Sequence, residues 1–342
     1  MTAIRTKGGL SVRLRPRALI VGAVLAAVAL VAAVVLIGTG DFTISAADVI
    51  RTLFGSGNPS QEFIVGDLRL PRALVGLLVG GALGMSGALF QSVSRNPLGS
   101  PDVLGLGQGA TAGALIMIVL FKGNATEVAL GALVGGLVTG AAIYLLAWRR
   151  GVHGYRLVLV GIGIAAIVTA VNGYLLTKAD LVEAARAVVW MTGSLNGRDW
   201  TQVWPLLALC AVLMPLALVY ARPLRMLEMG DDMGHALGIH AQRVRLIQLT
   251  VAVLLTAAAT AAAGPVPFVA LTAPQLARRL TRAAGPSPVT AALMGAALLV
   301  VADWASQRLF GADQLPVGAL TGVLGGVYLL WLLVSERKAG RI

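Results

Sequence analysis

Apolar runs long enough to cross a lipid bilayer recur along the whole chain, separated by short polar stretches. A membrane-spanning helix needs about 20 mostly apolar residues. The pattern therefore predicts an all-α polytopic membrane protein, with no charge-rich or Ser/Pro-rich linker that would divide its single transmembrane domain, residues 1–342. About ten helices are expected, at residues 18–37, 72–92, 103–121, 127–147, 155–176, 202–220, 244–263, 267–281, 288–309 and 316–335.

The polar connections differ in what they predict. Residues 39–71 are expected to be a long non-helical outer stretch, and residues 177–201 an outer stretch with a short interfacial helix. Residues 221–243 have helical spacing interrupted by glycines, which predicts two short helices that meet at a glycine corner. Residues 264–282 contain three prolines and are short for a full span, so a half-length or discontinuous helix is expected.

Glycines recur at every fourth position on three of the predicted helices. Positions four apart lie on one helix face, and a face of small residues lets another helix approach closely in lipid. The three rows, which we expect to form helix-packing faces, are Gly76, Gly80 and Gly84; Gly105, Gly109 and Gly113; and Gly318, Gly322 and Gly326. The similar order of the helices before and after the middle of the chain favours two related halves.

Composition and charge narrow the class of protein further. The chain is 57% hydrophobic and 12% charged, about half the charge of an ordinary soluble domain. The net charge of +12 would suit a nucleic-acid-binding protein, but most of the 27 Lys and Arg residues fall on the inner segments once the N-terminus is placed inside. This is the positive-inside pattern. It indicates a lipid bilayer and no nucleic acid as partner, and it places both termini in the cytoplasm, with residues 1–17 as a basic tail.

Few polar groups fall within the predicted helices. A charge at the bilayer centre costs about 2.5–3.5 kcal/mol, so Asp303 should face protein, water or a partner such as Arg308; a structural role is favoured over a proton relay. In the fifth helix, Thr169, Asn172 and Gly173 either make an interhelical contact or line a pathway or gate. Cys210 lies in an apolar run and is expected to be buried and inert.

The sequence offers no motif for catalysis. There is no GxxxxGK[ST] phosphate loop, no Ser-His-Asp arrangement and no pair of carboxylates. His153, His235 and His240 lie on inner segments without a further metal ligand nearby. We therefore expect no catalytic residue, metal site or cofactor on this chain.

Several blocks of sequence resemble the FecCD-type permeases, the membrane subunits of type II ABC importers for iron-siderophore complexes, haem and vitamin B12. The hallmark block is LRLPRALVGLLVGGALGMSGALFQSVSRNPLGSPDVLG at residues 68–105. Further similar blocks are LVLVGIGI at 157–164, RMLEMGDDMGHALGI at 225–239, GPVPFVALTAPQLARRL at 264–280 and QLPVGALTGVLGGVYLLWLL at 314–333. The block GSLNGRDW at 193–200, with RMLEMGDD, looks most similar to the ferric-enterobactin branch.

The resemblance implies an assembly rather than a protein that acts alone. Two permease subunits would enclose one pathway, with an extracytoplasmic binding protein outside and two ATPase subunits inside. The second subunit is expected to be a related permease, so a heterodimer is favoured over a homodimer. The implied function is import of a ferric siderophore by alternating access across the cytoplasmic (inner) membrane of a bacterium. Iron would pass as its chelate, and ATP and Mg would be held by the ATPases.

The resemblance also assigns roles to individual residues. Contact with the ATPase is expected in segment 221–243, at Leu227, Glu228, Gly230, Asp231, Asp232, Leu237 and Gly238. Docking of the binding protein is expected at Arg69, Arg72 and Arg308, whose other interpretation is interfacial snorkelling. One departure is Pro274-Gln275, where the family often has Pro-His; it puts no function in doubt if that side chain is structural.

Other functions stay open at this point. Within the family, the chain could be a vitamin B12 or haem permease. An ion-coupled secondary transporter would need several membrane-embedded carboxylates, and Asp303 alone is available. A membrane scaffold without transport activity is the third alternative. Co-purification of an ATPase chain would separate an ABC permease from the other two classes.

Overall fold

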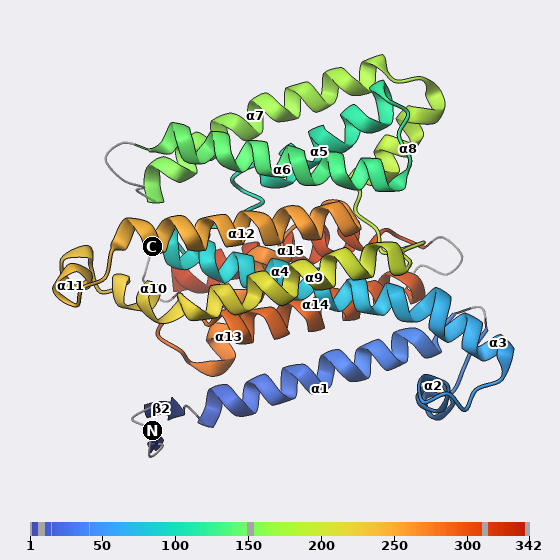
Figure 1. The fold of residues 1–342 in the computed structure, drawn as a ribbon, viewed down its shortest axis with the longest axis horizontal. Coiled ribbons are helices and arrows are strands. Elements are labelled where there is room, and N and C mark those ends of the chain that lie inside the picture. The colour runs from blue at the N-terminus through green and yellow to red at the C-terminus, as the bar shows by residue number, and fades with distance from the viewer. Residues whose placement is uncertain are drawn as a thin grey trace.

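The computed structural model describes residues 2–5, 11–14, 16–40, 42–148, 154–309 and 314–338, and His153 lies outside these ranges. Most helices run roughly along one long axis (Figure 1). The ten helices at the positions of the predicted spans are α1 (Pro16–Gly38), α4 (Leu70–Ser94), α5 (Leu106–Leu115), α6 (Ala125–Ala147), α7 (Gly154–Lys178), α9 (Trp200–Val219), α12 (Ala241–Ala263), α13 (Val269–Thr281), α14 (Pro288–Arg308) and α15 (Val317–Lys338). Each lies within a few residues of a predicted helix, so the all-α fold class is confirmed.

These helices differ in their capacity to span a membrane. Seven helical stretches among the described residues are long and apolar enough, and two shorter apolar helices cover Leu106–Leu120 and Val317–Leu332. The first of these is α5 continued by the π-helix η2 (Ile116–Leu120). Helix α13 has only 13 residues, as expected for a half-length helix in residues 264–282. The residues of its first turn, 269–272, are buried inside the bundle.

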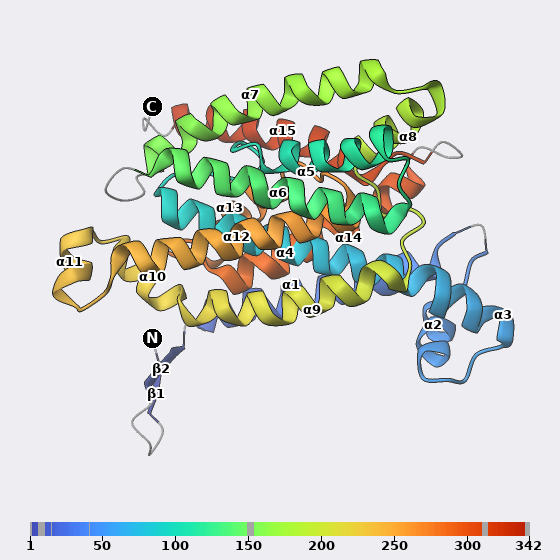
Figure 2. The same ribbon diagram turned by 45° about the horizontal axis from the view of Figure 1, so that its top comes forward.

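Helix α4 is the centre of the bundle. It packs against α9, α12, α13 and α14, while α5, α6 and α7 form a layer over α12, and α1 covers α14 on the opposite side (Figures 1 and 2). In the apolar window of the stretch that contains α4, 83% of residues are buried, against 17% for α7. One helix is therefore enclosed by this chain alone, whereas the other leaves most of its surface uncovered.

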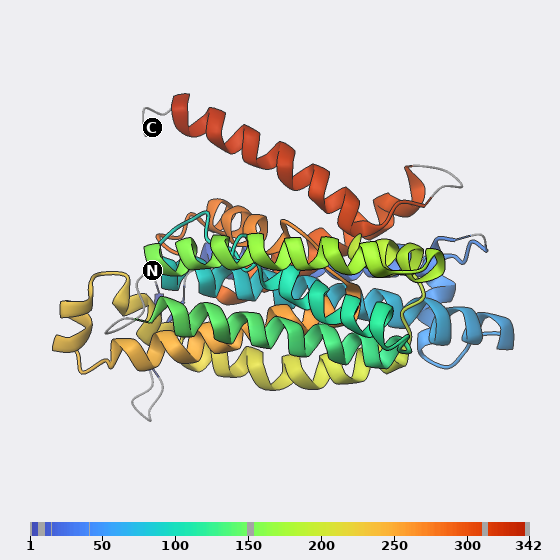
Figure 3. The ribbon, with the colours of Figure 1, turned by 90° about the horizontal axis from the view of Figure 1, so that it is seen from above.

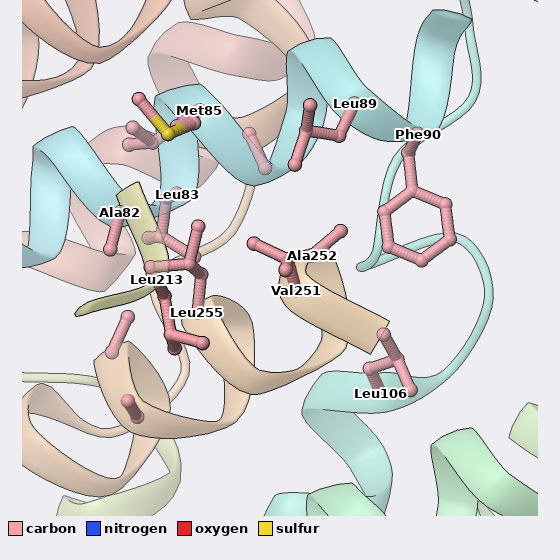
Figure 4. Close-up of a cluster of buried hydrophobic side chains, with 14 of the residues drawn as sticks. Ala82, Leu83, Met85, Leu89, Phe90, Leu106, Leu213, Val251, Ala252 and Leu255 are labelled. Atoms are coloured by element: carbon pink, nitrogen blue, oxygen red, sulfur yellow. The ribbon is translucent and has the colours of Figure 1, made fainter. Parts of the chain in front are cut away.

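The core between α4 and α12 is made of close-packed small and medium side chains (Figure 4). Leu83 and Leu89 of α4 are buried with Leu255 of α12. The hydroxyl of Ser86 donates a hydrogen bond to the carbonyl oxygen of Ala252 at 2.8 Å. A polar group that is satisfied within the core fixes how the two helices lie against each other.

The first two glycine rows lie at helix crossings. A side-chain carbon on Gly80 or Gly84 would collide with the backbone of α14, at Gly295 and Ala291 respectively. One on Gly113 would collide with the backbone of Gly131 in α6. These crossings bring two backbones into contact, which only a residue without a side chain permits.

The ends of these rows make looser or different contacts. A side-chain carbon on Gly76 would lie 3.2 Å from the Leu195 side chain, and one on Gly109 would collide with the Thr139 side chain. Gly105 has a φ of +83°, which favours glycine, and it lies against Ala165 of α7. Its role is thus a turn as well as a close contact.

The third row departs from the expectation at its far end. Gly318 lies against the backbone of Thr192, and a carbon on Gly322 would be 3.7 Å from Pro267, but nothing lies within 4 Å of such a carbon on Gly326. Instead, Gly325 is the residue that lies against Phe268. The two glycines are adjacent and project from different faces of α15, and the face of Gly325 is the one turned toward Phe268. Helix α15 diverges from the bundle along its length (Figure 3).

The outer stretch 39–71 is helical, contrary to the prediction. It contains α2 (Ala46–Leu53), α3 (Pro59–Glu62) and the π-helix η1 (Phe63–Arg69), which runs into α4. Ser45 caps α2 by accepting the N–H of Asp48 at 3.1 Å. Asn58 and Gln61 form a capping box around Pro59. These start signals were present in the sequence, and the prediction overlooked them. The interfacial helix expected in 177–201 is α8 (Leu181–Met191).

The inner stretch 221–243 has the predicted form. Helices α10 (Ala221–Leu227) and α11 (Asp231–Ala236) meet at Gly230, whose φ of +120° only glycine adopts easily.

In the N-terminal tail, the strands β1 (Thr2–Arg5) and β2 (Ser11–Leu14) pair antiparallel, a hairpin that was not predicted. The start of α1, the end of α15 and the α10–α11 corner share one end of the bundle, as the predicted topology requires (Figures 1 and 3).

Candidate functional site

The outer end of the bundle holds a buried ion pair between α4 and α14. The carboxylate of Asp303 is 1% exposed and accepts hydrogen bonds from Arg72 Nε at 2.9 Å and Nη2 at 2.8 Å. It also accepts one from Gln307 at 3.1 Å. The partner of Asp303 is therefore Arg72, one turn from the start of α4, and not Arg308 as suggested from sequence proximity.

The three arginines that the resemblance assigned to the binding protein have different surroundings. Arg72 is held by Asp303 and also lies 3.4 Å from Asn196. Arg69 donates hydrogen bonds to the carbonyl oxygens of Ile37 and Phe42 at 2.8 and 2.7 Å, where α1 ends. Arg308 is exposed, and no hydrogen bond joins it to any other described residue. Of the three, Arg308 alone presents its guanidinium freely to the outside within the described part of the chain.

The inner end carries residues 221–243, where the resemblance places the contact with the ATPase. The carboxylate of Asp231 accepts bonds from Arg245 Nη1 at 2.9 Å and Nη2 at 2.6 Å, and from Arg95 Nη2 at 2.5 Å. Hydrogen bonds from Arg245, more than those from Arg95, hold the pKa of Asp231 below its ordinary value of 3.8. Asp231 therefore faces its own chain, whereas Asp232 beside it is exposed.

The other residues to which the resemblance assigns ATPase contact also fall into two groups, those that face this chain and those that are exposed. Leu227 is buried, and the carboxylate of Glu228 lies beside Gly285 in the α13–α14 connection. Leu237 is 55% exposed, as are the large apolar side chains of Met226, Met229 and Met233 to similar degrees. Gly238 ends α11 with a φ of +74°. We call Met226, Met229, Met233 and Leu237 the inner apolar patch; flexible methionines are common on surfaces that bind other proteins.

A seam of polar groups joins the turn after α4 to α13 inside the bundle. Gln275 is 6% exposed and donates to Gln91 Oε1 at 2.6 Å and to the carbonyl oxygen of Pro97 at 2.9 Å. Gln91 in turn donates to the carbonyl oxygen of Leu271 at 3.1 Å. Gln275, which stands where the resemblance predicted a histidine, is thus a structural hydrogen-bond donor.

The same seam includes the start of α13. Phe268, which precedes this helix, has a φ of +67°, and its N–H donates to Asp102 Oδ2 at 3.3 Å. A helix that begins inside the bundle has N–H groups without partners in its first turn. A carboxylate at that point stabilises them and interacts favourably with the helix dipole. The sequence placed Asp102 in the hallmark block but gave no signal for this contact.

The gate candidates lie on the exposed helix α7. Asn172 is buried and donates to the carbonyl oxygen of Gln108 in α5 at 3.2 Å, the interhelical contact named as one of its two interpretations. Thr169 and Gly173 are exposed.

Cys210 is a buried free thiol in α9, as expected from its apolar surroundings in the sequence. Sequence reasoning missed Arg95 and Arg245 as site residues, although Arg95 lies in the hallmark block at residues 68–105.

Comparisons with known proteins cover nearly the whole chain. A sequence profile of the FecCD transport family matches residues 18–335. The chain is 47% identical over 300 residues to the ferric enterobactin transport system permease protein FepG of Escherichia coli, covering 88% of this chain and 91% of that protein. It is 36% identical to the achromobactin transport system permease protein CbrC of Dickeya dadantii, covering 93% and 92%.

Another relative agrees with this family, and a solved structure agrees with the fold. The iron(3+)-hydroxamate import system permease protein FhuG of Bacillus subtilis is 34% identical, covering 86% of this chain and 91% of that protein. A solved inward-facing structure of a metal-chelate type ABC transporter superposes with a TM-score of 0.80 at 24% identity, covering 92% of this chain and 99% of the other. The apolar helices and these relatives together identify the chain as an integral membrane protein.

Proposed function

Because the chain belongs to the FecCD transport family, we propose that it is one permease subunit of an ATP-driven importer that carries a ferric siderophore into the bacterial cytoplasm across the inner membrane. The observation that carries this proposal is the 47% identity with a ferric enterobactin permease over 88% of the chain. Iron would cross as its chelate, and ATP and Mg would be bound by partner ATPases, in line with the missing phosphate loop.

The surfaces of α7 and α15 support a second permease subunit as partner. Helix α7 exposes Ile162, Ile167 and Tyr174, and α15 exposes Val323 and Val327. Small and polar residues, such as Thr169 and Gly173, lie among those of α7, a mixture that suits a protein interface or an aqueous pathway better than uniform contact with lipid. We favour a heterodimer, in which a related permease covers these faces.

The two ends of the bundle support the remaining partners. Inside, the inner apolar patch and the exposed Asp232 offer a surface for the ATPases. An apolar patch that protrudes into water is stabilised when another protein covers it. Outside, Arg308 has the exposure and charge to engage an acidic residue of a binding protein. Arg69 and Arg72 have intramolecular partners and serve the outer end structurally in this proposal.

An ion-coupled mechanism receives less support. Asp303 is the carboxylate on which such a mechanism would depend, and Arg72 holds it in a bidentate ion pair at 2.8–2.9 Å. Its oxygens are also engaged by Gln307, and its side chain is 1% exposed. The arrangement thus favours alternating access that is driven from the cytoplasmic end.

The test is growth of a strain lacking this chain on defined ferric siderophores as sole iron source, together with co-purification of an ATPase chain. We expect loss of growth on one siderophore, restored by the wild-type chain. Leu237→Asp should reduce ATPase co-purification about tenfold, because it places a charge in an apolar contact. Phe54→Asp, a substitution of an apolar residue that is 85% exposed at the other end, is the control. Normal growth of the deletion strain on every ferric siderophore would contradict the proposal.

A further inference from the structure

One carboxylate joins the α10–α11 corner to two other helices. Arg245, one turn into α12, holds Asp231 in a bidentate ion pair, and the Arg245 side chain is only 7% exposed. Arg95, which ends α4, reaches the same carboxylate and also donates to the carbonyl oxygen of Leu227 at 2.5 Å. Its guanidinium therefore bridges the end of α10 and the start of α11, on both sides of Gly230.

The backbone conformation at Arg95 has a close counterpart at another helix end of this chain, which allows a comparison. Arg95 has a φ of +51°, a left-handed conformation that most L-residues avoid. Arg282 ends α13 at the same end of the molecule with a φ of +49°. Arg282, however, is exposed, and its guanidinium has no hydrogen bond to another described residue. The left-handed helix end therefore does not require the ion pair; the ion pair is a separate feature of Arg95.

The two arginines connect the α10–α11 corner to the most enclosed part of the bundle. Helices α4 and α12 are packed together and joined by the Ser86–Ala252 hydrogen bond. An ion pair with paired donors resists changes of angle more strongly than a single contact. We propose that Arg95 and Arg245 are positioning residues that clamp the coupling corner, through Asp231, to the cytoplasmic ends of α4 and α12, so that movement of the corner moves the core. This proposal rests on the proposed function, in which partner ATPases move the corner.

The experiment measures how much iron is transported for each ATP hydrolysed. The full importer, with its second permease subunit, ATPases and binding protein, is reconstituted in vesicles and given ferric enterobactin labelled with radioactive iron. Asp231→Asn keeps the shape of the side chain but removes its charge. We expect the ATPases to remain bound and ATP hydrolysis to continue, while iron transported per ATP falls about tenfold, the effect of losing a charged hydrogen bond. Arg95→Gln should give a similar loss.

Two comparisons make this result specific to the clamp. Arg282→Gln, the same substitution at a matching helix end, should leave the transport ratio at the wild-type value. The double variant Arg95→Gln/Asp231→Asn should lose less than the product of the two single losses, because both changes break the contact between Arg95 and Asp231. A wild-type ratio in Asp231→Asn and Arg95→Gln would overturn the proposal, and so would losses that multiply in the double variant.

A second measurement keeps the clamp testable apart from the substrate. If the wild-type importer moves no ferric enterobactin, the proposed function fails for that chelate, and the clamp is then judged on the purified chain in detergent. Trypsin should cleave after Arg225 about tenfold faster in Arg95→Gln and Asp231→Asn than in Arg282→Gln, because a released corner opens more often. Equal cleavage rates in all variants would overturn the clamp.

Discussion

At the scale of single residues, the structure assigns the charged groups to the protein itself as much as to its partners. Asp303 and Arg72 neutralise each other across the α4–α14 contact. Asp231 does the same with Arg95 and Arg245 at the opposite end. Asp232 and Arg308, near them, are exposed. Each end of the bundle thus combines a structural ion pair with a neighbouring charge that is available to another protein.

The outer ion pair should be important for stability. Asp303→Ala leaves the largely buried Arg72 without its counter-charge, which should lower the free energy of unfolding by about 3–5 kcal/mol. The measurement is thermal unfolding of the purified protein in detergent. Arg308→Ala, a change of an exposed arginine on the same helix, should change it by less than about 0.5 kcal/mol. The double variant Arg72→Met/Asp303→Leu should recover most of the loss; a double variant as unstable as Asp303→Ala would contradict this account.

The inner ion pair should give a defined pH dependence. Because the pKa of Asp231 is lowered from 3.8 in the folded protein, its contribution to stability is fully present above the unfolded value and is lost as pH falls through the folded pKa. The difference in melting temperature between wild type and Asp231→Asn should therefore be constant from neutral pH to about pH 5 and shrink only below about pH 4. A difference that already disappears near pH 6 would show that another group controls it.

At the scale of helices, the crossings of α4 with α14 and of α5 with α6 depend on the absence of side chains. Gly84 and Gly113 touch the backbone of the facing helix. In contrast, Gly107 of α5 has nothing within 4 Å of the position where a side-chain carbon would lie. Glycine therefore has two different roles within α5, and the residue without a close neighbour, Gly107, is the one outside the four-residue row.

This difference can be measured with one methyl group. Gly84→Ala should lower the free energy of unfolding by about 1–3 kcal/mol, because the new carbon collides with the carbonyl oxygen of Ala291 and forces α4 and α14 apart. Gly107→Ala should be neutral or stabilise the protein by up to about 1 kcal/mol, since alanine is the better helix former. Thermal unfolding of both variants side by side is the test; equal effects would mean that the close crossing is not limiting.

At the scale of the whole molecule, one chain leaves part of its helix surface without a protein neighbour. Helix α15 diverges from the bundle (Figure 3), and only 17% of the apolar window of α7 is buried. The two ends differ in character: α10 and α11 form the protruding corner at one end, and α2, α3 and α8 lie at the other (Figure 1). This shape suits a subunit that is completed by another one.

The orientation in the membrane can be tested with cysteine labelling. Cys210 is 3% exposed, so the wild-type chain should react with a membrane-impermeant maleimide at least about tenfold more slowly than an exposed cysteine does. In a Cys210→Ala background, Asp232→Cys should react only from the cytoplasmic side and Asn196→Cys only from the outer side of oriented vesicles. Reaction of both positions from the same side would contradict the topology.

The sequence by itself determined the number, order and bounds of the ten main helices, the half-length helix before residue 282 and the glycine corner at Gly230. These follow from local rules: apolar length, glycine and proline positions, and the distribution of basic residues. The helical character of residues 39–71 was equally local, and its caps at Ser45 and Asn58 could have been recognised.

Only the tertiary structure decided which groups meet across long separations in the chain. Asp303 pairs with Arg72 rather than with the nearby Arg308, and Asp231 with Arg95 and Arg245 rather than with a partner protein. A charge near the membrane binds whichever counter-charge the helix packing brings within about 4 Å, and packing is set by the whole bundle. For the same reason, the contact with Phe268 is made by Gly325 instead of Gly326, because packing decides which face of α15 turns toward the bundle.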